Sequence, residues 1–227
     1  MFFDPVYFLF VGPALLLAVY AQFKVKSTFN KYSQVGSTSG MTGAQAARTL
    51  LSFAGIDDVD VCEIGGFLSD HYDPSQKVLR LSSDVYNSRS LSAIGVACHE
   101  AGHAIQHARH YLPLHLRSAM VPVTQFSSSL SMWIIFAGFF LRPLLIVGII
   151  LFSVGVLFSI VTLPVEWDAS ARAKSLMVEA GIVSRTEAED SGRVLNAAFM
   201  TYLASTISAV MTLLYYLFRA GLLGDDD

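Results

Sequence analysis

The chain has 227 residues, of which 53% are hydrophobic and only 15% are charged. Soluble domains usually carry about 25% charged residues, so the composition argues against an ordinary soluble domain. The formal net charge is −3 and no dense run of Lys or Arg occurs, which argues against nucleic acid as a partner. Two cysteines, Cys62 and Cys98, are too few for a disulfide framework.

Four stretches without a charged residue are long enough to cross a hydrocarbon core, which takes about 20 helical residues. The first, residues 6–23, is followed by three lysines, which favours an uncleaved anchor over a signal peptide. Residues 118–141 and 144–165 are separated only by Arg142 and Pro143 and should form a helical hairpin. The fourth stretch is 194–218. The sequence therefore predicts an α-helical integral membrane protein with about four transmembrane helices.

The basic residues predict the orientation of these spans. Of the 15 Lys and Arg residues, only Arg142 and Arg219 fall outside segments 24–117 and 166–193. By the positive-inside rule, these two segments face the cytoplasm and both termini lie outside.

Segment 24–117 has the pattern of a small α+β unit. Thr42 and Gln45 form a capping-box pattern before a helix that should stop at Gly55. The elements expected after it are a strand over 59–64, a turn over 70–76, a strand over 78–82, and a helix capped by Ser90 that runs to about His110.

The last of these helices contains an HExxH motif, His99-Glu100-Ala101-Gly102-His103. Four residues are about 1.1 helical turns, so both imidazoles lie on one face and can share a metal ion, while Glu100 can reach a water on that ion. The motif predicts a zinc hydrolase centre. A helix with surface histidines is the simpler alternative.

A catalytic zinc ion needs three protein ligands and one open position. His107 continues the four-residue spacing, but eight residues span about 12 Å of helix, too far to share an ion with His99. The metzincin position, ten residues after His99, is Arg109. Glu166 follows the third span directly, and the hairpin returns it toward the metal helix. On spacing alone, an interfacial charge at a helix end is an equally good interpretation of Glu166.

Several longer strings resemble one bacterial family. They are AIGVACHEAGHAIQ (93–106), LSDHYDPSQKVLRLS (68–82), TGAQAARTLL (42–51) and LPVEWDASARA (163–173). Together they resemble the YugP-like integral-membrane neutral zinc metallopeptidases over nearly the whole chain, and the arrangement is similar to the HtpX and CAAX-protease group of membrane gluzincins. The resemblance implies a cytoplasmic zincin-like unit on a multi-pass protein of the bacterial inner membrane.

Family membership implies one zinc ion (Zn2+) per chain, held by His99, His103 and Glu166, with Glu100 as the catalytic base. The HtpX-like group carries an Asp four residues after the ligand Glu, where this chain has Ser170. The residue that supports a ligand histidine therefore stays open, with Asp168 and Asp70 as candidates. Intramembrane site-2 proteases also use HExxH, but the helix here is too polar to span lipid.

The predicted reaction is hydrolysis of a polypeptide, by analogy with HtpX a membrane-associated one, in membrane-protein quality control. An extended substrate would pair with residues 78–82, including Leu79 and Arg80, if that strand lies at an edge. His71 or Tyr72 could then stabilise the oxyanion. The rival interpretation is an inactive membrane scaffold or adaptor with a structural zinc site, closed by a fourth ligand. A homo-oligomer or an adaptor partner also stays open.

Overall fold

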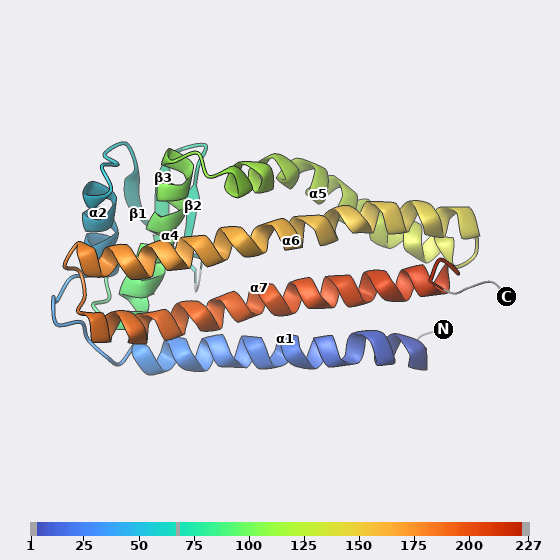
Figure 1. The fold of residues 1–227 in the computed structure, drawn as a ribbon, viewed down its shortest axis with the longest axis horizontal. Coiled ribbons are helices and arrows are strands. Elements are labelled where there is room, and N and C mark those ends of the chain that lie inside the picture. The colour runs from blue at the N-terminus through green and yellow to red at the C-terminus, as the bar shows by residue number, and fades with distance from the viewer. Residues whose placement is uncertain (1–3, 67–68, 224–227) are drawn as a thin grey trace. The chain divides into compact units, whose positions relative to one another are not determined.

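The structure is a computed structural model that describes residues 4–66 and 69–223; Figure 1 shows its helices and strands. The helices are α1 (Pro5–Tyr32), α2 (Gly43–Phe53), α3 (Ser83–Tyr86), α4 (Leu91–Ala108), α5 (Leu112–Gly138), α6 (Arg142–Glu179) and α7 (Arg185–Arg219), and the strands are β1 (Asp60–Ile64), β2 (His71–Asp73) and β3 (Val78–Ser82). The chain divides into two compact units, residues 1–22, 115–163 and 201–227, and residues 23–114 and 164–200.

Among the described residues, four helices are long and apolar enough to cross a membrane: α1, α5, α6 and α7. Within the first unit, large apolar side chains on these helices face outward; Leu16 is 74% exposed and Trp133 is 72% exposed. Such contiguous apolar surface suits contact with lipid, where a helix also satisfies its own backbone hydrogen bonds. The expected mostly helical chain with four candidate membrane spans is confirmed.

The expected short hairpin between α5 and α6 is present in the first unit. Only residues 139–141 separate the two helices. A Cβ on Gly138 would lie 2.4 Å from the backbone of Leu145, and one on Gly148 would lie 2.6 Å from the side chain of Ile135. Glycine at these two positions therefore allows the helices to pack closely.

The second unit contains a three-stranded sheet in the order β1-β3-β2. β1 is parallel to β3, with Val61 opposite Leu79, and β2 is antiparallel to β3, with Tyr72 also opposite Leu79. Two expectations were wrong here. Segment 70–76 was expected to be only a turn, but it contains strand β2. The Asp73 carboxylate accepts hydrogen bonds from the amides of Ser75 and Gln76, which forms a tight turn. This turn allows the residues that precede it to pair with β3 as an antiparallel hairpin. β3 is the central strand, so it is not an edge at which a peptide could add.

The capping signals of this unit are confirmed. Thr42 and Gln45 form the reciprocal capping box at the start of α2, and Gly55 after its end has a positive φ. The Ser90 side chain accepts a hydrogen bond from the Ala93 amide at the start of α4. Leu50 on α2, Leu79 and Leu81 on β3, and much of α4 bury their side chains in one apolar core. This core holds α4 as a rigid helix.

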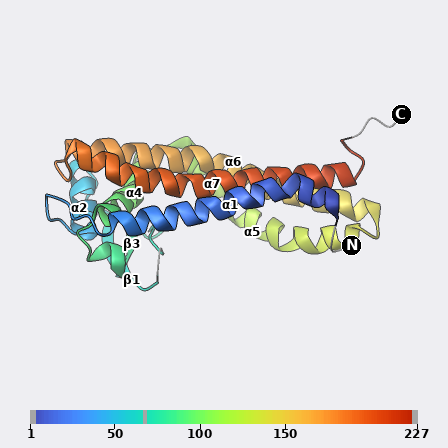
Figure 2. The ribbon, with the colours of Figure 1, turned by 90° about the horizontal axis from the view of Figure 1, so that it is seen from below.

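α1 and α7 continue from the first unit into the second, where the Arg193 guanidinium on α7 donates a hydrogen bond to the Tyr32 hydroxyl on α1 at 3.0 Å. Within each unit, the segments of α1 and α7 run side by side in Figure 1 and again in the view from below in Figure 2. α6 also continues without a break past its apolar part to Glu179, so Glu166 lies on a continuous helix.

Candidate metal centre

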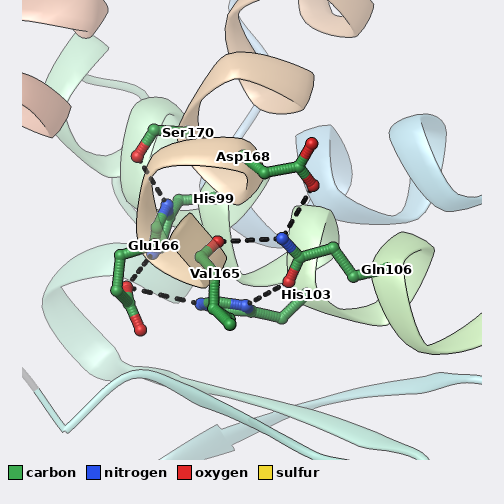
Figure 3. A network of polar contacts seen from close by, with 7 residues as sticks. All are labelled: His99, His103, Gln106, Val165, Glu166, Asp168 and Ser170. Atoms are coloured by element: carbon green, nitrogen blue, oxygen red, sulfur yellow. Dashed lines mark hydrogen bonds and ion pairs between the residues drawn. The ribbon is translucent and has the colours of Figure 1, made fainter. Parts of the chain in front are cut away.

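Two helices of the second unit supply the candidate metal ligands. α4 carries His99, Glu100 and His103, and α6 carries Glu166. Figure 3 shows Glu166 projecting from α6 toward the two imidazoles. One potential ligand atom from each of His99, His103 and Glu166 lies within 4.8 Å of the other two.

The ligand atoms converge on a single carboxylate oxygen. Glu166 Oε2 lies 3.2 Å from His99 Nε2 and 3.6 Å from His103 Nε2. Glu166 is 2% exposed and His103 is 7% exposed, whereas the His99 side chain keeps 14% of its surface accessible. The cluster is thus largely desolvated but reaches solvent on the His99 side.

Close contact between the helices makes this convergence possible. A Cβ on Gly102 of α4 would lie 2.6 Å from the carbonyl oxygen of Ala169 on α6. Gly102 directly precedes His103, and Ala169 lies three residues after Glu166. Because glycine has no side chain, the helical turns that carry these two candidate ligands can lie close together.

A buried glutamine orients His103. Gln106 Nε2 donates to the Val165 carbonyl at 2.8 Å and to Asp168 Oδ2 at 2.8 Å, which leaves its Oε1 facing His103 Nδ1 at 3.0 Å (Figure 3). An amide oxygen only accepts, so His103 Nδ1 carries the proton and donates. In the neutral ring, Nε2 then presents its lone pair toward Glu166.

His99 has an equivalent partner on α6. The Ser170 hydroxyl lies 3.0 Å from His99 Nδ1. When that hydroxyl accepts a hydrogen bond from the Nδ1–H group, His99 Nε2 also presents a lone pair toward the same carboxylate. Both rings are therefore oriented as metal ligands usually are, with the other ring nitrogen engaged by a hydrogen bond.

Without a cation, this arrangement brings three electron-pair donors together. Burial opposes ionisation of Glu166, but the hydrogen bonds and positive charge that His103 and His99 supply when their Nε2 atoms are protonated more than offset it and lower the pKa of Glu166. Burial works against a charged His103, yet the hydrogen bond and charge of Glu166, with the charge of Glu100, raise the pKa of that imidazole. The environment of these three side chains thus favours a positive charge, such as a proton or a metal ion, between their ligand atoms.

The donor set fits zinc. Two imidazole nitrogens and one carboxylate, with their outer hydrogen bonds already made, are the three-ligand set of catalytic zinc sites that keep a fourth position for water. Glu100 follows a ligand directly and is half-buried.

The two residues considered as supports for a ligand histidine have different surroundings. Asp168 accepts the Gln106 amide and pairs with Arg172 at 2.5 Å, so it acts on His103 only through Gln106. Asp70 Oδ1 accepts the Ser82 amide at 2.8 Å, and burial raises the pKa of Asp70.

The residues considered for substrate contact lie on the sheet. Leu79 is fully buried in the core, and Arg80 pairs with Asp73 at 2.9 Å. His71 is exposed and its Nδ1 lies 2.8 Å from the Ser69 carbonyl. The Tyr72 hydroxyl lies 2.9 Å from His107 Nδ1, and burial raises the pKa of Tyr72 to about 12.

Sequence reasoning missed two residues that contact the histidines, Ser170 and Gln106. Ser170 stands four residues after Glu166, where a helix returns to the same face, but a serine is not distinctive there. Gln106 stands three residues after His103 on the same helical face. Gln106 could have been found from the sequence, because a long polar side chain on the apolar face of a helix needs a hydrogen-bond partner.

Comparison with known proteins agrees with this chemistry. Residues 7–221 match the family described as "Putative neutral zinc metallopeptidase". A Bacillus subtilis (strain 168) protein named "Putative membrane protease YugP" is 46% identical over 205 residues, which cover 89% of this chain and 91% of that protein. No solved structure matches the chain significantly.

Proposed function

Because this chain belongs to the neutral zinc metallopeptidase family, we propose that it is a membrane-embedded zinc endopeptidase that cleaves polypeptides at the cytoplasmic face of the bacterial cell membrane. His99, His103 and Glu166 hold one zinc ion, and Glu100 is the general base. The supporting observation is the convergence of these three donors within 4.8 Å, with Glu100 adjacent to the first.

The chemistry follows from the roles of four side chains. A bound zinc ion supplies a Lewis acid that polarises the peptide carbonyl and lowers the pKa of water to about 7. Glu100 takes the proton from the attacking water and later gives it to the leaving amine. Gln106 and Ser170 hold the imidazoles in the orientation that leaves Nε2 free to bind the metal.

An extended substrate would add to β2 rather than to β3. β3 is bonded on both sides, whereas β2 is an edge of the sheet and contacts α4. Pairing of a peptide through backbone hydrogen bonds would give low sequence specificity. His71 and Tyr72 lie on this strand and are the residues of the sheet best placed to contact such a peptide.

The scaffold with a structural zinc site is less well supported. A structural site is closed by four protein ligands. Within the described residues, the candidate ligand group contains only His99, His103 and Glu166. Three other residues could have closed it, but His71 contacts the Ser69 carbonyl, Asp70 accepts from Ser82, and Asp168 is bonded to Gln106 and Arg172.

Catalysis is tested with Glu100→Gln, which keeps the size of the side chain but removes the base. The purified protein should cleave casein, and the variant should lose at least about a hundredfold in rate, because general bases contribute roughly 10²–10⁴. Both proteins must be shown to hold zinc. Equal rates in two zinc-loaded proteins would defeat the proposed base, and a zinc-loaded but inactive wild type would favour the scaffold.

The ligand set is tested with Glu166→Ala. Loss of one of three ligands should reduce the zinc content of the purified protein well below one per chain, measured by elemental analysis. Glu179→Ala is a matched control on the same helix, because the Glu179 carboxylate bonds only the neighbouring Ser175 hydroxyl among the contacts described. Full zinc occupancy in Glu166→Ala would remove Glu166 from the site.

A further inference from the structure

A cavity of the second unit lies between α1 and α7, and none of its lining residues belongs to the candidate ligand cluster. Its volume is about 460 Å³, within the range of roughly 300–1,000 Å³ that is typical of ligand pockets. Three cationic side chains line it: Lys24 and Lys31 from α1, and Arg193 from α7. None of the described residues that line it carries a carboxylate, so the cavity is positively charged.

The two helices present matching stripes to this cavity. Lys24, Ser27, Thr28 and Lys31 are spaced i, i+3, i+4 and i+7 along α1, which places them on one helical face. The residues from α7 repeat the same spacing, starting at Arg193. The cavity is therefore a groove between two facing helix stripes, lined by cations and by hydroxyl and amide groups.

One cation is held in place. The Arg193 guanidinium donates to the hydroxyl of Tyr32, which is 4% exposed, and lies 3.4 Å from Asp190. The Lys31 amine lies 5.2 Å from the centre of the Tyr32 ring. Lys24 and Lys31 form no ion pair with a carboxylate in the described part of the chain, so their charges remain available to an anion.

The groove lies where the polar part of each helix meets its apolar part. Lys24 directly follows the apolar stretch 6–23, whose last residue, Phe23, is 72% exposed, and Arg193 directly precedes the apolar stretch 194–218. An exposed tryptophan lies near the groove. Trp167 packs on Phe199 of α7, and the Lys174 amine lies over the Trp167 ring. The same amine lies 3.4 Å from the side chain of Asn196, which lines the groove. Tryptophan is enriched at membrane interfaces.

We propose that this groove binds the phosphate of an anionic phospholipid headgroup. The ligand chemistry is a phosphate anion met by two free lysines, a fixed guanidinium and neutral donors. A basic pocket between membrane helices at the cytoplasmic surface is a known way of binding such lipids. The lipid is favoured over free phosphate because the residues that line the groove lie where the apolar segments begin. The site does not depend on the metal centre.

The test is titration of the full-length protein in detergent with short-chain phosphatidylglycerol, phosphatidylcholine or inorganic phosphate, read by native mass spectrometry. Lys24→Gln and Lys31→Gln should each weaken phosphatidylglycerol binding about fivefold, as expected for loss of one basic residue near an anionic lipid. Lys26→Gln is the matched control, because Lys26 is exposed on the same helix but does not line the groove. Asn196→Ala, which keeps every cation, should also weaken binding.

Melting curves show whether each variant is folded. An equal effect of Lys26→Gln and Lys24→Gln would mean general surface attraction and overturn the site. Equal binding of phosphatidylcholine would do the same. If inorganic phosphate binds with the same dependence on Lys24 and Lys31 while phosphatidylglycerol does not, the lipid is the wrong source of the phosphate.

Discussion

At the scale of single residues, the candidate site depends on side chains that carry no catalytic signature of their own. Gln106 makes three hydrogen bonds inside the unit, to His103, Val165 and Asp168. It thereby joins the metal helix α4 to α6 and decides which nitrogen of His103 faces Glu166. Arg172 extends the network, since it pairs with Asp168 and lies over the Tyr111 ring at 5.6 Å.

Gln106→Met tests this positioning role. Methionine has a similar volume but neither donates nor accepts strongly, so His103 should lose its fixed orientation. Zinc affinity should fall about 10–100-fold, as is usual when an outer partner of a metal ligand is removed. Competition with a zinc chelator measures it.

Gln34→Met serves as the control for that experiment, because Gln34 is exposed and lies outside the network. Melting of the zinc-free proteins separates loss of fold from loss of zinc binding. An unchanged zinc affinity in Gln106→Met would show that the glutamine does not orient the ligand.

At the scale of secondary-structure elements, the site is a meeting of two helices rather than a property of one motif. α4 supplies His99, Glu100 and His103, but the third candidate ligand and the hydrogen-bond partner of His99 come from α6. The spacing between these helices is set where Gly102 faces the Ala169 carbonyl.

Gly102→Ala should therefore disturb the site although alanine favours helices. The added Cβ would lie 2.6 Å from a backbone oxygen, which cannot rotate away, so the helices must separate. We expect a loss of about 1–3 kcal/mol in the free energy of unfolding and weaker zinc binding. Denaturant unfolding and chelator competition measure these two effects.

Gly12→Ala is the comparison, since Gly12 is also helical and a Cβ there would meet no atom within 4 Å. It should leave zinc binding unchanged. Wild-type stability and zinc affinity in Gly102→Ala would mean that the helices tolerate wider spacing and that close contact does not set the geometry.

At the scale of the whole molecule, orientation in the membrane decides which compartment the proposed peptidase faces. The distribution of basic residues predicts that residues 24–117 and 166–193 face the cytoplasm. The native cysteines offer a direct test, because Cys62 is exposed on β1 whereas Cys98 is fully buried, which raises the pKa of its thiol to about 12. Only a thiolate reacts readily with thiol reagents, so Cys98 should remain unlabelled.

A maleimide that cannot cross membranes should therefore leave Cys62 unlabelled in intact cells and label it after permeabilisation. In a Cys62→Ser background, Phe140→Cys should be labelled in intact cells, because Phe140 is 71% exposed in the turn between α5 and α6, and the predicted orientation puts that turn outside. Mass spectrometry of the modified protein measures both. The reverse pattern would invert the orientation.

The sequence by itself determined the features that depend on neighbouring residues. The four apolar helices, the caps at Thr42 and Ser90, and the placing of His99 and His103 on one helical face follow from runs, caps and spacings of a few residues. The family, too, could be identified from contiguous strings, and the match over residues 7–221 confirms it.

Only the tertiary structure decided how distant segments meet. The position of β3 between β1 and β2 depends on pairing across a hairpin and a crossover, which alternation within one strand cannot reveal. From spacing alone, Glu166 could be interpreted either as a metal ligand or as an interfacial charge. Packing of α4 against α6 places its Oε2 3.2 Å from His99 Nε2. The contacts of Ser170 with His99 and of Gln106 with His103 also depend on the fold. Serine and glutamine are common polar residues, so only the partner that the tertiary structure places beside each one shows what it does.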